Sequence, residues 1–183
     1  MAGGCLVIQV EWRLHTKPDR GDMMLKLAVQ GIDTAEANRI REGGPDANGL
    51  PAICRTAEGP ANPCRHCLQL ISEGDDKLVL SYRPFKALQP YAEAGPIFLH
   101  RQDCRRYEDH ALPAWFAYLQ PAMVLGYGRD DWIRYESGGV VPGAQLGDLC
   151  RTVLADPETS YVHIRSRYGC FQCRVSRARS VAD

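Results

Sequence analysis

Two short apolar runs joined by a proline-rich segment constrain the fold more than any other feature of this sequence. The runs are Leu78–Leu80 and Ile97–Leu99, each preceded by Gly-containing turn residues. Runs this short, flanked by Gly and Pro, favour strands, because an amphipathic helix needs about three turns of periodic pattern. Each proline between the runs removes a backbone donor that a central strand needs. We therefore predict two core strands and a loop over residues 83–95, whose aromatic residues Phe85 and Tyr91 fold back over the sheet.

The remaining pattern predicts an α+β domain. Apolar residues at helical spacing predict short helices, and short alternating segments beside turns predict strands. The predicted helices cover residues 34–42, 112–119 and 146–154, and the further strands cover residues 25–29, 52–55, 122–127, 131–135, 161–164 and 170–175. We expect one α+β domain over residues 24–183, on a largely antiparallel sheet with about three short helices. Residues 1–23 end in a polar, turn-rich break and are predicted to be a weakly attached extension or one edge strand.

Composition narrows the classes of function. The chain has 183 residues and a formal net charge of zero, with 22 basic and 22 acidic residues. A neutral chain has no global electrostatic attraction to nucleic acid or to an anionic membrane. The apolar runs fall well short of the roughly 18 residues that span a bilayer, and the N-terminal sequence lacks the basic region of a signal peptide. We therefore expect a cytoplasmic protein whose cysteines stay reduced.

The sharpest chemical signal is a pair of C-x-x-C motifs, Cys64/Cys67 and Cys170/Cys173. Two intervening residues allow both sulfurs of a motif to face one point, which is how half of a tetrahedral zinc site is built. The leading hypothesis is a structural zinc site formed by all four cysteines. The two motifs are much further apart than the roughly 15–20 residues of compact zinc modules, so the tertiary fold must bring them together. A bulge or turn at Phe171–Gln172 is also required, because a regular strand would place Cys170 and Cys173 on opposite faces.

Two other interpretations of these cysteines remain open. They are independent structural thiols, since buried free cysteine is common, or a redox dithiol, which the absence of a thioredoxin-like strand-then-helix setting disfavours. Cys150 falls on the apolar face of a predicted helix and is interpreted as a core thiol. Cys104 follows His100 by four positions, and Cys104 and His110 are weak candidate ligands that a charged surface explains equally well.

Two further functions are alternatives to the zinc site. In the first, an enzyme uses a Cys64 thiolate as nucleophile and Arg65 as the anion-binding residue. Its pocket would be completed by Tyr82, Tyr91 and His163, although His163 is explained as well by a hydrogen-bonded structural role. In the second, an arginine-rich C-terminal region binds phosphate or nucleic acid weakly. The absence of a nucleic-acid motif favours a solvated face instead. The arginines of this region are residues 165, 167, 174, 177 and 179.

Several short motifs together resemble the domain of unknown function 1203 family. They are Pro63-Cys64-Arg65, Leu78–Tyr82, Pro90-Tyr91, Gly95–Phe98, Tyr161–His163, Gly169–Phe171 and Arg174-Val175. The resemblance extends over roughly Leu25 to Val175 and implies a small bacterial, cytoplasmic-type protein without an established activity. It places Cys64, Arg65 and Cys170 in the family pattern, whereas Cys67 and Cys173 look like departures from it. Either this branch of the family gained a metal site or the two extra thiols are incidental.

Overall fold

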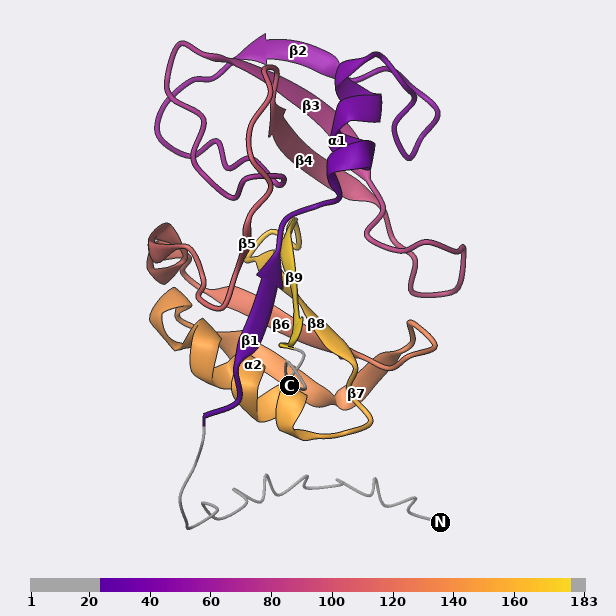
Figure 1. The fold of residues 1–183 in the computed structure, drawn as a ribbon, viewed down its shortest axis with the longest axis vertical. Coiled ribbons are helices and arrows are strands. Elements are labelled where there is room, and N and C mark those ends of the chain that lie inside the picture. The colour runs from indigo at the N-terminus through magenta and orange to yellow at the C-terminus, as the bar shows by residue number, and fades with distance from the viewer. Residues whose placement is uncertain (1–23, 179–183) are drawn as a thin grey trace, which may run out of the picture.

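The computed structural model describes residues 24–178, which form two antiparallel sheets (Figure 1). The larger sheet has six strands in the order β5-β1-β9-β8-β6-β7, and the smaller has the order β2-β3-β4. The strands are β1 (Leu27–Gln30), β2 (Ile53–Thr56), β3 (Asp76–Tyr82), β4 (Gly95–His100), β5 (Glu108–Asp109), β6 (Ala122–Tyr127), β7 (Ile133–Val141), β8 (Tyr161–Ser166) and β9 (Phe171–Arg177). The helices are α1 (Thr34–Arg41) and α2 (Leu146–Ala155), with 3-10 helices at Ala114–Tyr118 and Gly143–Gln145. The predicted α+β class is confirmed.

The smaller sheet contains the two predicted core strands, β3 and β4. They pair antiparallel, with Leu78 opposite Leu99 and Leu80 opposite Ile97. These four side chains are buried with one face of α1. The helix begins where predicted, because the Asp33 carboxylate accepts a hydrogen bond from the backbone N–H of the first turn and so satisfies one of its unpaired donors.

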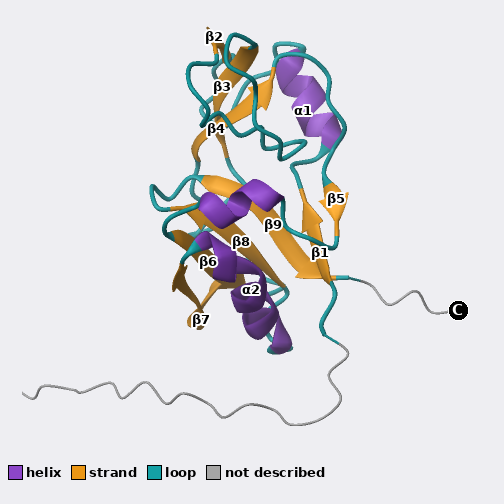
Figure 2. Ribbon diagram, turned by 90° about the vertical axis from the view of Figure 1, so that its left-hand side faces the viewer, coloured by secondary structure: helices purple, strands orange, loops and turns teal. Residues whose placement is uncertain are grey.

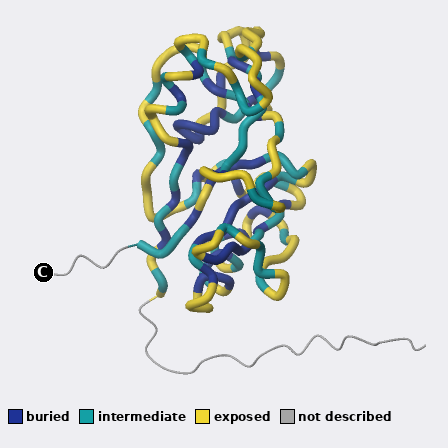
Figure 3. The backbone as a smooth tube through the Cα atoms, turned by 90° about the vertical axis from the view of Figure 1, so that its right-hand side faces the viewer, coloured by how far each residue is buried: buried dark blue, intermediate teal, exposed yellow. Residues whose placement is uncertain are grey.

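The larger sheet is covered on one face by α2 (Figure 2). The apolar face of this helix, which includes Leu146, Cys150 and Leu154, forms a second core with Val162 and Ile164 of β8. The helical spacing predicted this packing, and Cys150 is the buried core thiol that it indicated. Buried segments are therefore found around both the smaller and the larger sheet (Figure 3).

The loop over residues 83–95 joins β3 to β4 of the smaller sheet and packs against the larger one. Phe85 is buried, as predicted, but against Tyr127 and His163 of the larger sheet. Tyr91 instead packs edge-on against Trp132 and Tyr135, which are both exposed. The loop thus folds back over the larger sheet rather than over the strands that it joins.

Two details differ from the sequence predictions, and a third prediction is not tested. The helix predicted over residues 112–119 is a 3-10 helix, because Pro113 and Pro121 leave room for only about two turns. The strand predicted over 131–135 begins later and extends to Val141. The edge strand considered within residues 1–23 lies outside the described part of the chain. Within residues 24–178 no helix has the length and apolar character needed to cross a membrane.

Candidate metal centre

The first C-x-x-C motif forms a tight turn beside β4, which we call the knuckle (residues 64–67). The backbone N–H of Cys64 donates to the carbonyl of Gln69 at 2.9 Å, closing the turn. The backbone N–H of Arg65 donates to the carbonyl of Phe98 in β4, also at 2.9 Å. Leu68 takes a positive φ of 54° where the chain leaves the knuckle. These contacts hold both cysteines against the end of β4.

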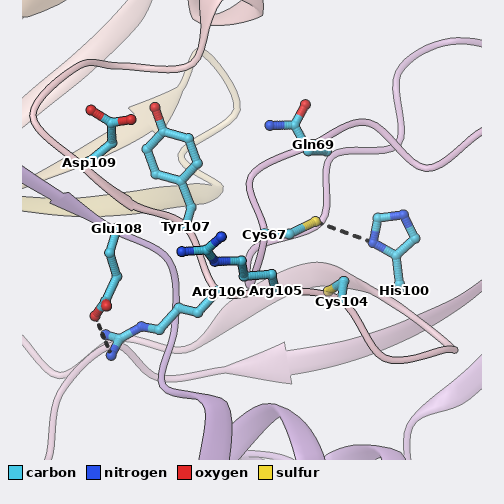
Figure 4. Close-up of a pocket in the computed structure, with 9 residues that line it drawn as sticks. All are labelled: Cys67, Gln69, His100, Cys104, Arg105, Arg106, Tyr107, Glu108 and Asp109. Carbon is cyan, nitrogen blue, oxygen red and sulfur yellow. Dashed lines mark hydrogen bonds and ion pairs between the residues drawn. The ribbon is translucent and has the colours of Figure 1, made fainter.

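His100 and Cys104 complete a group of four donor side chains with the knuckle. His100 ends β4 and Cys104 lies in the loop that follows. The Cys64 and Cys104 sulfurs are 3.9 Å apart, and the Cys67 sulfur is 3.4 Å from Nδ1 of His100. The four ligand atoms all lie within 4.8 Å of one another. Figure 4 shows Cys67 directed at His100, with Cys104 beside them, at one end of a surface hollow.

Two of these separations, Cys64 to Cys104 and Cys67 to His100, match a tetrahedral metal site. With Zn–S bonds of about 2.3 Å and Zn–N bonds of about 2.0–2.1 Å, two sulfurs lie roughly 3.8 Å apart and a sulfur and a nitrogen roughly 3.6 Å apart. Both measured separations fall within about 0.2 Å of these values. The described structure therefore positions a Cys/His group to hold a metal ion.

Hydrogen bonds within the group favour the thiolate form of one cysteine, Cys64, and raise the pKa of the Cys67 and Cys104 thiols. The Arg41 guanidinium and Nδ1 of His66 each lie 3.1 Å from the Cys104 sulfur. The backbone N–H of His100 donates to the Cys64 sulfur. Hydrogen bonds from the Cys104 and Cys67 thiols hold the pKa of Cys64 well below the ordinary thiol value. Cys64 is thus the first thiol of the group to carry a negative charge.

His66 lies next to this group and orients it. Its Nε2 is 3.0 Å from the Thr34 hydroxyl at the start of α1, which fixes the ring with Nδ1 facing Cys104. Burial, followed by the Arg41 charge, lowers the pKa of His66. A neutral His66 can donate one hydrogen bond, so its tautomer is set by the partners on its two sides.

The second C-x-x-C motif lies outside this group, which corrects the predicted combination of Cys64 and Cys67 with Cys170 and Cys173. The predicted bulge exists, since Cys173 pairs with Ile164 and Phe171 pairs with the next residue, Arg165, leaving Gln172 as the extra residue. The bulge sends Cys173 into the core beneath α2, where burial raises the pKa of its thiol well above the usual value. Cys170 is half-buried at the turn before β9.

The residues that replace the second motif carried only a faint sequence signal. A histidine and a cysteine four positions apart resemble the close ligand spacings of zinc sites, but nothing local shows that this segment lies beside the knuckle. His110, the other weak candidate, lies elsewhere. Its Nδ1 is 2.7 Å from the carbonyl oxygen of Leu27.

The predicted enzyme pocket is divided by the fold. Arg65 is buried, and its guanidinium donates to the backbone carbonyls of Phe171 and Pro63 instead of facing a ligand. Burial lowers the pKa of Arg65 to about 10. Tyr82 and His163 do line one cavity, whereas Tyr91 joins the exposed aromatic group described above. Cys64 has no exposed surface, so its thiolate is shielded from any substrate in that cavity.

The arginines of the C-terminal region do not act as one surface. Arg165 is buried and forms an ion pair with Glu93 at 2.6 Å. Arg177 donates to the carbonyls of Leu154 and Asp156 at the end of α2. Arg167 stacks on the exposed ring of its neighbour Tyr168, Arg174 lies over the ring of Tyr161, and Arg179 lies outside the described residues.

Residues 61–177 match the model of a family described as "Protein of unknown function (DUF1203)". The chain belongs to this family. The match starts after β2, well beyond the Leu25 at which the sequence resemblance appeared to begin. All four donors of the metal centre lie inside the DUF1203 match, whereas Arg41 precedes it. No match was found among the curated proteins or among the solved structures.

Proposed function

We propose that the protein binds a zinc ion through Cys64, Cys67, His100 and Cys104. The observation that carries this proposal is the convergence of three sulfurs and one imidazole nitrogen within 4.8 Å of one another, with two of the separations at tetrahedral values. Thiolate and imidazole ligands in this geometry favour zinc over the harder cations magnesium, calcium and manganese. The cysteines of the described chain are all free thiols, which agrees with a reducing compartment such as the cytoplasm.

We assign this zinc a structural role, because four protein ligands leave no open position for water or substrate. Three thiolates and one neutral imidazole give a zinc site a net charge of −1. Arg41 supplies positive charge beside the site, since its guanidinium donates to the Cys104 sulfur from a side chain that is only 8 % exposed, and it also pairs at 3.3 Å with the exposed Asp103. A partly buried anionic site is more stable when a cation lies beside it in this way.

Metal analysis of the purified full chain tests the proposal. We expect close to one zinc per chain, and cobalt substitution should give the thiolate-to-cobalt absorption of a tetrahedral site. Cys104→Ser and His100→Ala should lose most of the zinc. Cys170→Ser is the matched control, because Cys170 is half-buried and outside the group, and it should retain the metal. A folded wild-type protein that takes up neither metal would refute the proposal.

Alkylation kinetics separate the structural site from a catalytic Cys64. Zinc-bound thiolates should resist iodoacetamide until a chelator is added, and then several cysteines should react together. A single thiol that reacts fast without chelator, and is lost in Cys64→Ser, would instead support the nucleophile alternative.

A further inference from the structure

A second cavity lies where the two sheets meet, away from the metal centre. Its volume is about 770 Å³, within the range of small-molecule sites. One wall is the β1–α1 connection, another is the start of the 83–95 loop, and the floor is formed by β8 and β9. The lining residues used below are His163, Arg174, Arg83, Lys86 and Tyr82.

His163 on the floor of this cavity is a buried polar group without a partner. The residue is 0 % exposed, and neither ring nitrogen has a hydrogen-bond partner within residues 24–178. Its ring packs among four aromatic rings with centroids 4.8–5.2 Å away, those of Phe85, Tyr127, Tyr161 and Phe171. An unpaired buried polar group costs about 1–3 kcal/mol, so a structural histidine at this position would ordinarily be hydrogen bonded.

The charges that line the cavity are unbalanced once internal pairing is considered. Two of its three carboxylates are ion-paired: Asp33 caps α1 and lies 3.8 Å from Arg106, and Glu36 pairs with Arg39. Asp131 accepts a hydrogen bond from Tyr161 but has no cationic partner in the described structure. In contrast, Arg83, Lys86 and Arg174 form no ion pair with a carboxylate in the described structure. Three cations, two from the 83–95 loop and one from the floor, are therefore available to a ligand.

Arg174 and His163 are placed to act on the same ligand. They are direct partners across the β8–β9 ladder, so their side chains share one face of the sheet. The Arg174 guanidinium is held over the Tyr161 ring at 3.5 Å, which leaves its N–H groups free to form a fork around an oxyanion. The Tyr82 hydroxyl adds a further donor, because burial raises its pKa to about 12 and keeps it protonated.

We propose that this cavity binds a small metabolite bearing phosphate or carboxylate groups. Arg83, Lys86 and Arg174 supply the positive charge, and the His163 imidazole donates a hydrogen bond to the ligand once the side chains that cover its ring nitrogens move aside, since neither nitrogen is exposed without a ligand. The proposal does not depend on the metal centre and can fail while that centre stands.

Titration of the full chain with inorganic phosphate and with citrate, against sodium chloride at matched ionic strength, tests this proposal. The readout is the pair of His163 ring-nitrogen signals in nitrogen-15 spectra, assigned by their loss in His163→Phe. We expect at least one anion to shift these signals with saturation. Response to phosphate alone identifies a phosphate ligand, and response to citrate alone identifies a carboxylate ligand. No shift with either anion overturns the proposal.

Two arginine variants locate the binding. Arg174→Gln should lower the affinity for the responding anion at least tenfold. Arg167→Gln, which removes an exposed arginine from the β8–β9 turn outside the cavity, should leave its affinity unchanged. Equal affinities in the two variants would mean an adventitious ion only and would overturn the proposal.

His163→Phe distinguishes a ligand-binding histidine from a structural one. Removing an unpaired polar group should leave the melting temperature without anion unchanged or higher, while the stabilisation by anion is lost. A large drop in melting temperature with the anion response intact would contradict the inference. Should the variant fail to fold, the wild-type signals and the arginine pair still decide the outcome.

Discussion

Replacing Arg41 by Gln should weaken zinc binding strongly without unfolding the protein. The Arg41 Nη2 atom lies 3.1 Å from the Cys104 sulfur, and the side chain is 8 % exposed. A hydrogen bond to a charged group contributes about 1.5–3 kcal/mol, which corresponds to a roughly 10- to 150-fold rise in Kd. Replacing a residue that hydrogen-bonds to a metal ligand commonly lowers metal affinity by about 10- to 100-fold. Glutamine keeps an amide donor but loses the charge that balances the anionic site.

Arg39→Gln is the matched control for this variant. Both arginines lie in the last turn of α1, where each complements the helix dipole. Arg39, however, is 43 % exposed and pairs with Glu36 on the surface. Zinc affinity should be measured by competition with a chromogenic chelator at fixed pH and ionic strength. If the two variants bind zinc with equal affinity within a factor of two, Arg41 does not stabilise the site as argued.

Three further outcomes follow from the structure. Burial, then Arg165 and Arg174, lower the pKa of His163 well below 6.5. As pH falls through 6.5, the unfolded chain therefore binds a proton at His163 that the folded chain does not bind. In denaturant melts, the free energy of unfolding of the wild type should fall by about 1 kcal/mol more than that of His163→Phe between pH 6.5 and 5.5. A Cβ at Gly31 would lie 2.0 Å from the His66 carbonyl oxygen. Gly31→Ala should therefore lower the free energy of unfolding by about 1–3 kcal/mol and weaken zinc binding in chelator competition. Gly139→Ala is the control, because the nearest atom to its added Cβ is 3.5 Å away, and it should leave zinc affinity unchanged. Chelation of zinc should raise amide hydrogen exchange in β2–β4 but not in β6 or β8, because the donors belong to the core of the smaller sheet; a uniform rise would contradict this.

The elements that sequence predicted best are those whose signal is local. The apolar spacing around Cys150 defined α2, and Asp33 marked the start of α1. The prolines correctly separated β3 from β4. In each case the residues that determine the element lie within it or next to it in the chain.

Only half of the candidate metal centre was predicted, because its other two donors reach the site through a long-range contact. The spacing of Cys64 and Cys67 identifies them as candidate ligands from the sequence alone. The other two donors are determined by the β-bridge between the knuckle and Phe98. That bridge brings the end of β4 to the knuckle. A second C-x-x-C motif appeared to be the better partner, yet the bulge at Gln172 directs Cys173 into the opposite core. The periodicity of apolar residues in the sequence does not show which distant segment a short turn will contact.

The knuckle is also the joint between the two sheets. Between its cysteines, the carbonyl of Arg65 accepts from Ile32 and the carbonyl of His66 accepts from Tyr107, each at 2.9 Å. The Arg65 guanidinium donates to the carbonyl of Phe171 at the start of β9. Ile32 and Phe171 both line the cavity that contains His163. A metal bound to Cys64 and Cys67 would hold both ends of this turn, so the proposed zinc is best understood as a support for the junction on which the cavity is built.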